Sequence, residues 1–181
     1  KNDESTFDES KFRIAFVGTI NERKGFHILF DAWKDFKNEN TELILIGSIA
    51  SGFKEEILKE KTIIALNHIP HSRIPKVLSS CSALVLPSIY DSFGLVGLEA
   101  LSCGVPLITN SNCGVSELIT DGLEGLIYNL HDSKDLHSKL NLLYNDKLLL
   151  ENMRKKAIAI AKINSWEVYQ KRLVQITDSL L

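Results

Sequence analysis

The stretch PSIYDSFGLVGLEALSCGVP, residues 87–106, follows the short apolar run ALVL, residues 83–86, and contains leucines at Leu95, Leu98 and Leu101. A short apolar run of this kind is typical of a buried parallel strand, and the leucine spacing predicts a helix. The chain therefore turns here from strand to loop to helix. In open α/β sheets ligands bind at the carboxyl ends of the strands. The stretch thus predicts both the fold class and the place of a site.

Two carboxylates, Asp91 and Glu99, stand in this stretch with seven residues between them. The helix start between them offers unpaired backbone N–H groups and a positive dipole end, which suit a phosphate. Phe93, Gly94 and Leu95 supply these donors, and Gly94 lets a ligand come close because it has no Cβ. Ionised carboxylates only accept hydrogen bonds, which suits sugar and ribose hydroxyls. We interpret the constellation as a sugar-nucleotide site.

Structural roles remain open for the acidic residues. Asp91 could be a plain helix N-cap or turn residue. Glu99 could be a solvent-facing helix glutamate, but its apolar neighbours predict that the carboxylate is buried, and a buried carboxylate needs partners. We expect Glu117, in the sequence GVSEL, to serve structure rather than the ligand.

A second constellation is FVGTINERKGF, residues 16–26, in which a predicted strand ends at Gly18 and a loop with Arg23 and Lys24 leads into a helix. Two cations at the carboxyl end of a strand fit a diphosphate, because Lys is a compact charge and Arg donates two parallel hydrogen bonds. The alternative is that both are solvated residues, although cations at a helix start oppose the helix dipole. The segment is neither a Walker A sequence nor a GxGxxG fingerprint.

At these residues the chain closely resembles the retaining glycosyltransferases of family 4, which have the two-domain GT-B fold. Their signature, Glu-x7-Glu followed by Ala, Gly and Pro, is matched by Asp91, Glu99, Ala100, Gly104 and Pro106. The resemblance implies that Glu99 binds the ribose hydroxyls of the donor nucleotide and that Asp91 contacts the donor sugar. Asp in place of the first Glu is a departure from the signature, because its side chain is shorter by one methylene.

The family pattern in the first loop is Gly-Arg, a short loop, then Lys-Gly. Lys24 and Gly25 match the last pair, whereas Thr19 stands where the first Arg is usual, so we expect Arg23 to take over its phosphate contact. The resemblance also places the base near Ile69, which could equally be a core residue. The predicted catalytic residues are Asp91, Lys24 and Arg23, and the predicted donor-binding residues are Gly18, Thr19, Ile69, Ser92, Phe93, Gly94, Leu95 and Glu99.

Short apolar runs alternate with amphipathic segments along the chain, which predicts an α/β fold with a Rossmann-like parallel sheet of about six strands and helices on both faces. The expected strands are 13–17, 42–46, 62–66, 83–86, 107–109 and 125–127. The expected helices, besides the one after Ser92, are 24–37, 53–59, 73–80, 134–144, 147–161 and 166–181. Residues 1–11 are expected to be an interdomain linker and residues 12–181 the donor-binding domain, the C-terminal half of a GT-B fold. Trp166, Tyr169 and Leu173 have the spacing of a face that packs on the other domain.

The bulk composition is that of a soluble globular protein, with 181 residues, 44% hydrophobic residues and a net charge of −2. The sequence shows no extended basic face, so nucleic acid is not expected as a partner. No apolar run is long enough to span a bilayer. We expect a cytoplasmic location, compatible with peripheral membrane attachment of the full-length protein. The three cysteines, Cys81, Cys103 and Cys113, form no CxxC pair and are expected to be reduced and packed. No metal or other cofactor is expected.

The resemblance implies transfer of a hexose from a UDP or GDP sugar to a glycan, lipid or other acceptor, as in polysaccharide biosynthesis. In this family the acceptor-binding domain precedes the donor domain, so we expect it to be missing from this chain and the fragment alone to be inactive. Two alternatives stay open: a stand-alone nucleotide-sugar-binding module, and a GT-B relative such as an epimerase or a phosphorylase.

Overall fold

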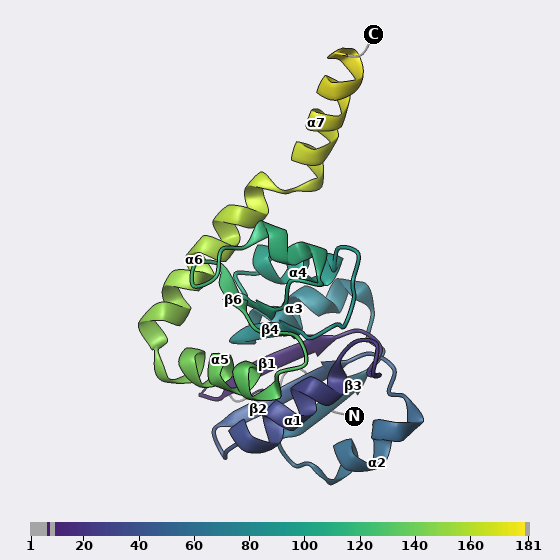
Figure 1. Ribbon diagram of the computed structural model, residues 1–181, viewed down its shortest axis with the longest axis vertical. Coiled ribbons are helices and arrows are strands. Elements are labelled where there is room, and N and C mark those ends of the chain that lie inside the picture. The colour runs from purple at the N-terminus through teal and green to yellow at the C-terminus, as the bar shows by residue number, and fades with distance from the viewer. Residues whose placement is uncertain (1–6, 8–9, 180–181) are drawn as a thin grey trace.

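Six parallel strands form one sheet in the order β3-β2-β1-β4-β5-β6 in the computed structural model (Figure 1), which describes residue 7 and residues 10–179. The strands are β1 Phe12–Val17, β2 Thr41–Ile46, β3 Ile63–Asn67, β4 Ala83–Leu86, β5 Leu107–Thr109 and β6 Gly125–Ile127. The helices are α1 Phe26–Phe36, α2 Ser51–Lys59, α3 Ile74–Ser79, α4 Leu95–Ser102, α5 Ser133–Asn145, α6 Lys147–Ile163 and α7 Trp166–Ser179, with short 3-10 helices η2 His71–Arg73 and η3 Gly114–Leu118. The predicted linker, residues 1–11, lies mostly outside the described residues.

Alternate residues of each central strand enter two separate hydrophobic cores. In β1, Ile14 and Phe16 belong to the core under α1 and α5, whereas Ala15 belongs to the core under α3, α4 and α6. This alternation follows from the two-residue period of a strand, and burial on both faces explains why the strands read as continuous apolar runs. The prediction of a parallel sheet with helices on both faces is confirmed.

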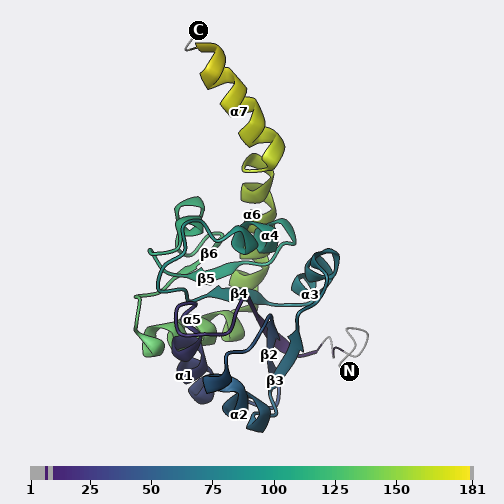
Figure 2. The same ribbon diagram turned by 90° about the vertical axis from the view of Figure 1, so that its right-hand side faces the viewer.

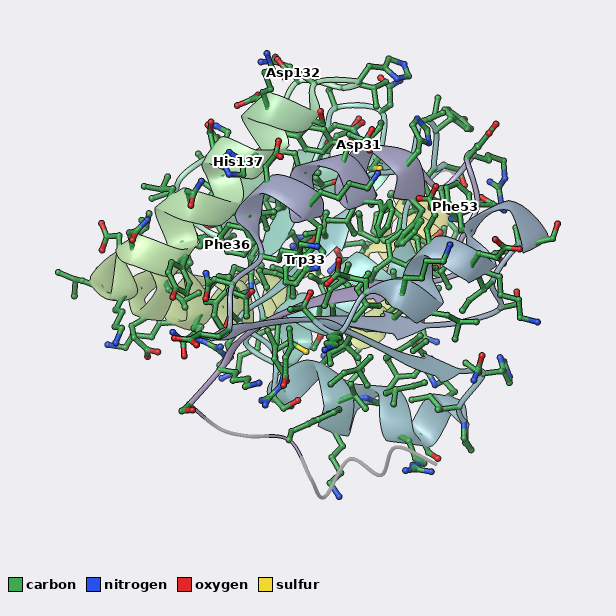
Figure 3. All side chains as sticks on the ribbon, turned by 90° about the horizontal axis from the view of Figure 1, so that it is seen from below. Asp31, Trp33, Phe36, Phe53, Asp132 and His137 are labelled. Carbon is green, nitrogen blue, oxygen red and sulfur yellow. The ribbon has the colours of Figure 1, made fainter. Side chains whose placement is uncertain are left out.

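Helix α1 packs its aromatic stripe against the sheet, as its spacing predicts. Trp33 and Phe36 lie on the inner side of the helix and are nearly inaccessible (Figure 3), and Phe36 also meets Tyr144 of α5 with 5.7 Å between ring centroids. Edge-to-face aromatic pairs of this kind add specific packing to the burial of apolar area. They fix α1, and with it the loop that precedes the helix.

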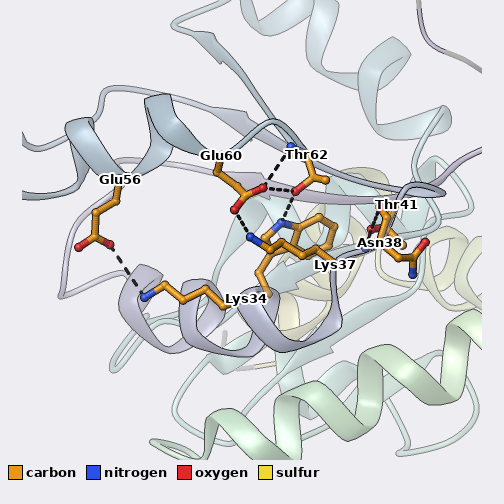
Figure 4. Close-up of polar contacts among 8 residues, drawn as sticks. Lys34, Lys37, Asn38, Thr41, Glu56, Glu60 and Thr62 are labelled. Atoms are coloured by element: carbon orange, nitrogen blue, oxygen red, sulfur yellow. Dashed lines mark hydrogen bonds and ion pairs between the residues drawn. The ribbon is translucent and has the colours of Figure 1, made fainter.

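A polar cluster ties the end of α1 to the loop before β3 (Figure 4). Trp33 Nε1 donates to Thr62 Oγ1 at 3.0 Å, Thr62 Oγ1 donates to Glu60 at 3.0 Å, and Lys37 is paired with the other oxygen of Glu60. Burial works to raise the pKa of Glu60, but the hydrogen bonds from Lys37 and Thr62 outweigh it and hold that pKa below its usual value. The carboxylate therefore stays ionised within this cluster.

Helix α7 leaves the body of the domain and extends away from it (Figures 1 and 2). The side chains of Trp166, Tyr169 and Leu173 are 65%, 55% and 49% exposed. These are the residues that the sequence assigns to a packing face, and their exposure leaves that face without a cover within the described residues. Packing against another domain stays a prediction.

Candidate functional site

The candidate site lies between β1 and β4, where the order of strands along the sheet reverses. The two strands are neighbours, and their following helices, α1 and α4, cover opposite faces of the sheet. The loops after β1 and β4 therefore diverge, which opens a crevice at the carboxyl ends of the strands. Both sequence constellations stand at this edge, because each begins at the end of one of these strands.

The two loops touch at Gly25 and Pro87. Gly25 has a φ of +67°, and a Cβ on it would stand 1.8 Å from the carbonyl oxygen of Pro87. The Ile89 N–H donates to the Arg23 carbonyl at 3.1 Å, which joins the loops a second time. Only glycine allows both this left-handed conformation and this close approach of two backbones. Gly25 is thus the residue that brings the cationic loop onto the acidic one.

An ion pair bridges the crevice. Lys24 Nζ lies 2.5 Å from Asp91 Oδ2, and the two side chains are 23% and 18% exposed. The Lys24 N–H donates to the side-chain oxygen of Asn21 at 2.9 Å, which orders the backbone that carries the ammonium group. The N-cap position of α4 is Gly94, not Asp91. The interpretation of Asp91 as a helix cap is therefore wrong, because its side chain turns to Lys24 instead.

The start of α4 presents free hydrogen-bond donors. Gly94 has a φ of +81°, and the N–H groups of Phe93, Gly94 and Leu95 donate to no acceptor within the described part of the chain. The carbonyls around them are engaged, since Phe93 accepts from Val115 at 2.6 Å and Asp91 accepts from Gly114 at 3.0 Å. The loop after β5 thus holds the donors in place. A helix start with free N–H groups favours an anion.

Buried polar side chains support the loop after β4 from below. Asn110 Nδ2 donates to the Ser88 carbonyl at 3.1 Å and to the Tyr128 hydroxyl at 3.3 Å, and that hydroxyl donates to the Pro87 carbonyl at 3.4 Å. Ser88, Asn110 and Tyr128 are almost fully inaccessible to solvent, and burial raises the pKa of Tyr128. The phenol is therefore a neutral donor. Nothing in the sequence indicates this network, because its members come from three different strand ends.

Glu99 contacts a histidine that belongs to the loop after β3. Its Oε1 lies 3.0 Å from His71 Nε2 in η2, and the two side chains are 36% and 76% exposed. The expectation that Glu99 is buried is wrong, because this flank of α4 faces solvent, as the 53% exposure of Leu95 shows. Nothing in the sequence indicates His71 as a partner, since it lies 28 positions from Glu99 along the chain. Ile69, in the same loop, is half-buried and packs on the core under α3 and α4.

The other predicted site residues lie around the ion pair. Gly18, at the end of β1, has a φ of +137°, and a Cβ there would meet no atom within 4 Å. Thr19, Arg23 and Ser92 are exposed. The Arg23 guanidinium has no partner among the described residues, so it is available to an incoming anion. The structure therefore places the predicted residues on one edge of the sheet, with Lys24 and Asp91 in direct contact.

The three cysteines are free thiols, with Cys81 and Cys113 buried and Cys103 half-buried. Burial raises the pKa of Cys81 to about 12 and raises the pKa of the other two above the usual value. All three are therefore neutral near pH 7. The described residues bring together no group of three or more His, Cys, Asp or Glu side chains that could hold a metal ion. Within residue 7 and residues 10–179, no helix combines the length and apolar character needed to cross a membrane.

The chain is similar in sequence to known glycosyltransferases. The model of the family described as glycosyl transferases group 1 matches residues 1–160. An uncharacterized glycosyltransferase of Methanocaldococcus jannaschii is 30% identical over 169 residues, which are 92% of this chain and 48% of that protein. A D-inositol 3-phosphate glycosyltransferase of Paenarthrobacter aurescens is 30% identical over 167 residues, which are 86% of this chain and 41% of that protein.

Among solved structures, the Anabaena protein HepE in complex with UDP and glucose superposes with a TM-score of 0.80. It is 23% identical, and the match covers 95% of this chain and 49% of that one. At this identity the likeness shows the fold. The chain spans about half the length, or less, of each of these proteins.

Proposed function

Because the chain belongs to the glycosyl transferases group 1 family, we propose that it is the donor-binding part of a retaining, family 4 glycosyltransferase that transfers a hexose from a nucleoside diphosphate sugar. The contact between Lys24 and Asp91, beside the free N–H groups of the α4 start, carries the proposal. A Cβ on Gly94 would stand 3.9 Å from the Asp91 carboxyl carbon, so the carboxylate and the helix donors are neighbours. A ligand with phosphates and hydroxyls suits such a set of groups.

In the proposed reaction the bond between the anomeric carbon and the diphosphate oxygen breaks, the acceptor oxygen bonds to that carbon on the same face, and the acceptor hydroxyl passes its proton to the leaving diphosphate. Negative charge grows on the leaving diphosphate. Lys24, Arg23 and the N–H groups of residues 93–95 stabilise that charge, which is catalysis by donors set in place beforehand. No protein nucleophile and no metal are required.

Different residues bind the nucleoside and the sugar ends of the ligand. Glu99 accepts hydrogen bonds from the ribose hydroxyls, Asp91 from the sugar, and Ile69 lies against the base. Without donor, Lys24 and Asp91 neutralise each other. Binding then exchanges their ion pair for two contacts with the ligand, Lys24 to phosphate and Asp91 to a hydroxyl. A diphosphate supplies a new negative partner for Lys24 when it leaves Asp91, which favours a diphosphate over an uncharged sugar.

We further propose that the acceptor binds to a domain outside this chain, that the donor base is uracil or guanine, and that the full-length protein acts in the cytoplasm in polysaccharide biosynthesis. The length of the chain relative to its relatives supports the first point. The binding of UDP by a protein of the same fold supports the second. On this proposal the chain alone binds nucleotide weakly and transfers no sugar.

Titration calorimetry with UDP, GDP and their hexose conjugates tests the proposal. We expect heat with one of the two nucleotides, a loss of that heat in Glu99→Ala, and weaker binding in Lys24→Ala. Lys34→Ala is the matched control, because Lys34 is an exposed lysine of the following helix whose partners are Asp31 and Glu56. No heat with any nucleotide would overturn the donor site. Sugar transfer by the chain alone would overturn the role of a second domain.

A further inference from the structure

The Glu99–His71 pair brings together two elements that are distant along the chain. His71 belongs to η2, which follows the edge strand β3, whereas Glu99 is in the middle of α4, which follows β4. In the sheet, β2 and β1 separate β3 from β4. The loop after β3 must therefore reach across the carboxyl edge to place the imidazole 3.0 Å from Glu99 Oε1.

Stability of the fold does not explain this pair. The side chain of His71 is 76% exposed and that of Glu99 is 36% exposed, and pairs with such access to solvent contribute little to folding. The loop itself is held by other contacts. Ile69 packs on the core, the Arg73 N–H donates to the Pro70 carbonyl at 2.9 Å, and α3 follows directly. His71 is thus presented to Glu99 from a loop that is fixed without it.

The contact has a clear consequence for the carboxylate. His71 occupies one oxygen of Glu99, which leaves Oε2 and the remaining lone pairs of Oε1 as acceptors. A carboxylate held in this way meets two neighbouring hydroxyls without first losing rotational freedom. Groups that are ordered before binding avoid that entropic cost when the ligand arrives.

We infer that His71 is a positioning residue of the donor site, which holds Glu99 ready for the vicinal hydroxyls of the nucleotide ribose. This inference rests on the proposed function, because it requires Glu99 to contact the ribose. It adds a residue that acts through Glu99 and sets the preference for a ribonucleotide over a deoxyribonucleotide. His68, in the same loop and also exposed, has no described contact with Glu99.

The experiment compares UDP with 2′-deoxy-UDP, and GDP with 2′-deoxy-GDP, by titration calorimetry on the wild-type chain and on His71→Ala, His71→Gln and His68→Ala. We expect His71→Ala to weaken binding of the ribonucleotide by about three- to ten-fold. Binding of the deoxy form should change less, so the ratio between the two falls. His71→Gln keeps an N–H donor of similar reach and restores most of the ratio, and His68→Ala behaves as wild type.

The outcomes separate this inference from the proposed function. If Glu99→Ala abolishes nucleotide binding while His71→Ala leaves the ribose-to-deoxyribose ratio unchanged, the inference is wrong and the donor site stands. Tighter ribonucleotide binding in His71→Ala also overturns it, because His71 would then compete with the ribose for Glu99. If the wild-type chain binds none of the four nucleotides, the proposed function fails, and the inference with it.

Discussion

From the contact between Gly25 and Pro87 we predict that Gly25→Ala destabilises the fold. In Gly25→Ala the new Cβ would stand 1.8 Å from the Pro87 oxygen and 2.6 Å from its carbonyl carbon, both backbone atoms. The loops after β1 and β4 must then separate by roughly 1 Å, since carbon and oxygen atoms do not approach within about 3 Å. The substitution also forces alanine to adopt a φ of +67°.

The expected cost is the sum of two effects. A left-handed conformation costs a non-glycine residue about 1 kcal/mol. Overpacking at this contact costs about 1–3 kcal/mol, which includes the strain that separation of the loops puts on the hydrogen bond between Ile89 and Arg23. We therefore expect Gly25→Ala to lower the free energy of unfolding by about 2–4 kcal/mol, which lowers Tm by about 5–15 °C in a domain of this size.

Gly122→Ala is the matched control, because Gly122 has a φ of +86° but a Cβ added to it would meet no atom within 4 Å. It should cost only the conformational part, about 1 kcal/mol. Urea unfolding followed by circular dichroism measures both variants. If Gly25→Ala and Gly122→Ala lose the same free energy, the close approach of the two loops does not constrain the domain, and the account of how the crevice is assembled is refuted.

Two further predictions concern the polar cluster at Glu60 and the buried network that supports the loop after β4. The lowered pKa of Glu60 means that its ionised form stabilises the fold above about pH 4.5, and this contribution is lost as pH falls through the folded-state pKa. The free energy of unfolding, measured with urea between about pH 6 and pH 3, should therefore fall less steeply with decreasing pH in Glu60→Gln than in the wild type. The same pH dependence in both proteins would contradict the role of Lys37 and Thr62. Tyr128→Phe should lower the free energy of unfolding by about 1 kcal/mol, because it removes a buried hydroxyl from its hydrogen bonds. Tyr90→Phe, at a side chain 66% exposed, should cost nothing measurable, and equal costs for the two variants would argue against the network below the loop.

Much of the fold could be predicted because its signals are local. The apolar runs mark the strands, and the helix spacing of residues such as Trp33 and Phe36 marks the buried side of α1. The placement of both constellations at one sheet edge also follows from sequence, because parallel strands share the direction of their carboxyl ends. Helix ends differ from expectation by one or two residues, as for α2, which begins at Ser51 rather than at Phe53.

Contacts within the site could not be predicted, because they depend on distances between segments far apart in the chain. The sequence indicates Lys24 and Asp91 as separate ligand contacts, and the structure pairs them although they lie 67 positions apart. It indicates a buried Glu99, and the structure leaves that side chain partly open to solvent and gives it His71 as a partner. Apolar neighbours in sequence did not predict burial here, since the flank of α4 that carries Leu95 and Glu99 is partly open to solvent.

The sequence by itself determined the parallel sheet, the helices on its two faces and the edge at which the chemistry gathers, because these follow from periodicity and from the direction of parallel strands. Only the tertiary structure decided which groups meet. A backbone contact that glycine alone permits, at Gly25, sets Lys24 against Asp91, and a loop from the edge strand carries His71 to Glu99. The physical reason is that a hydrogen bond or an ion pair requires atoms within about 3 Å, and only packing of the whole domain fixes distances on that scale.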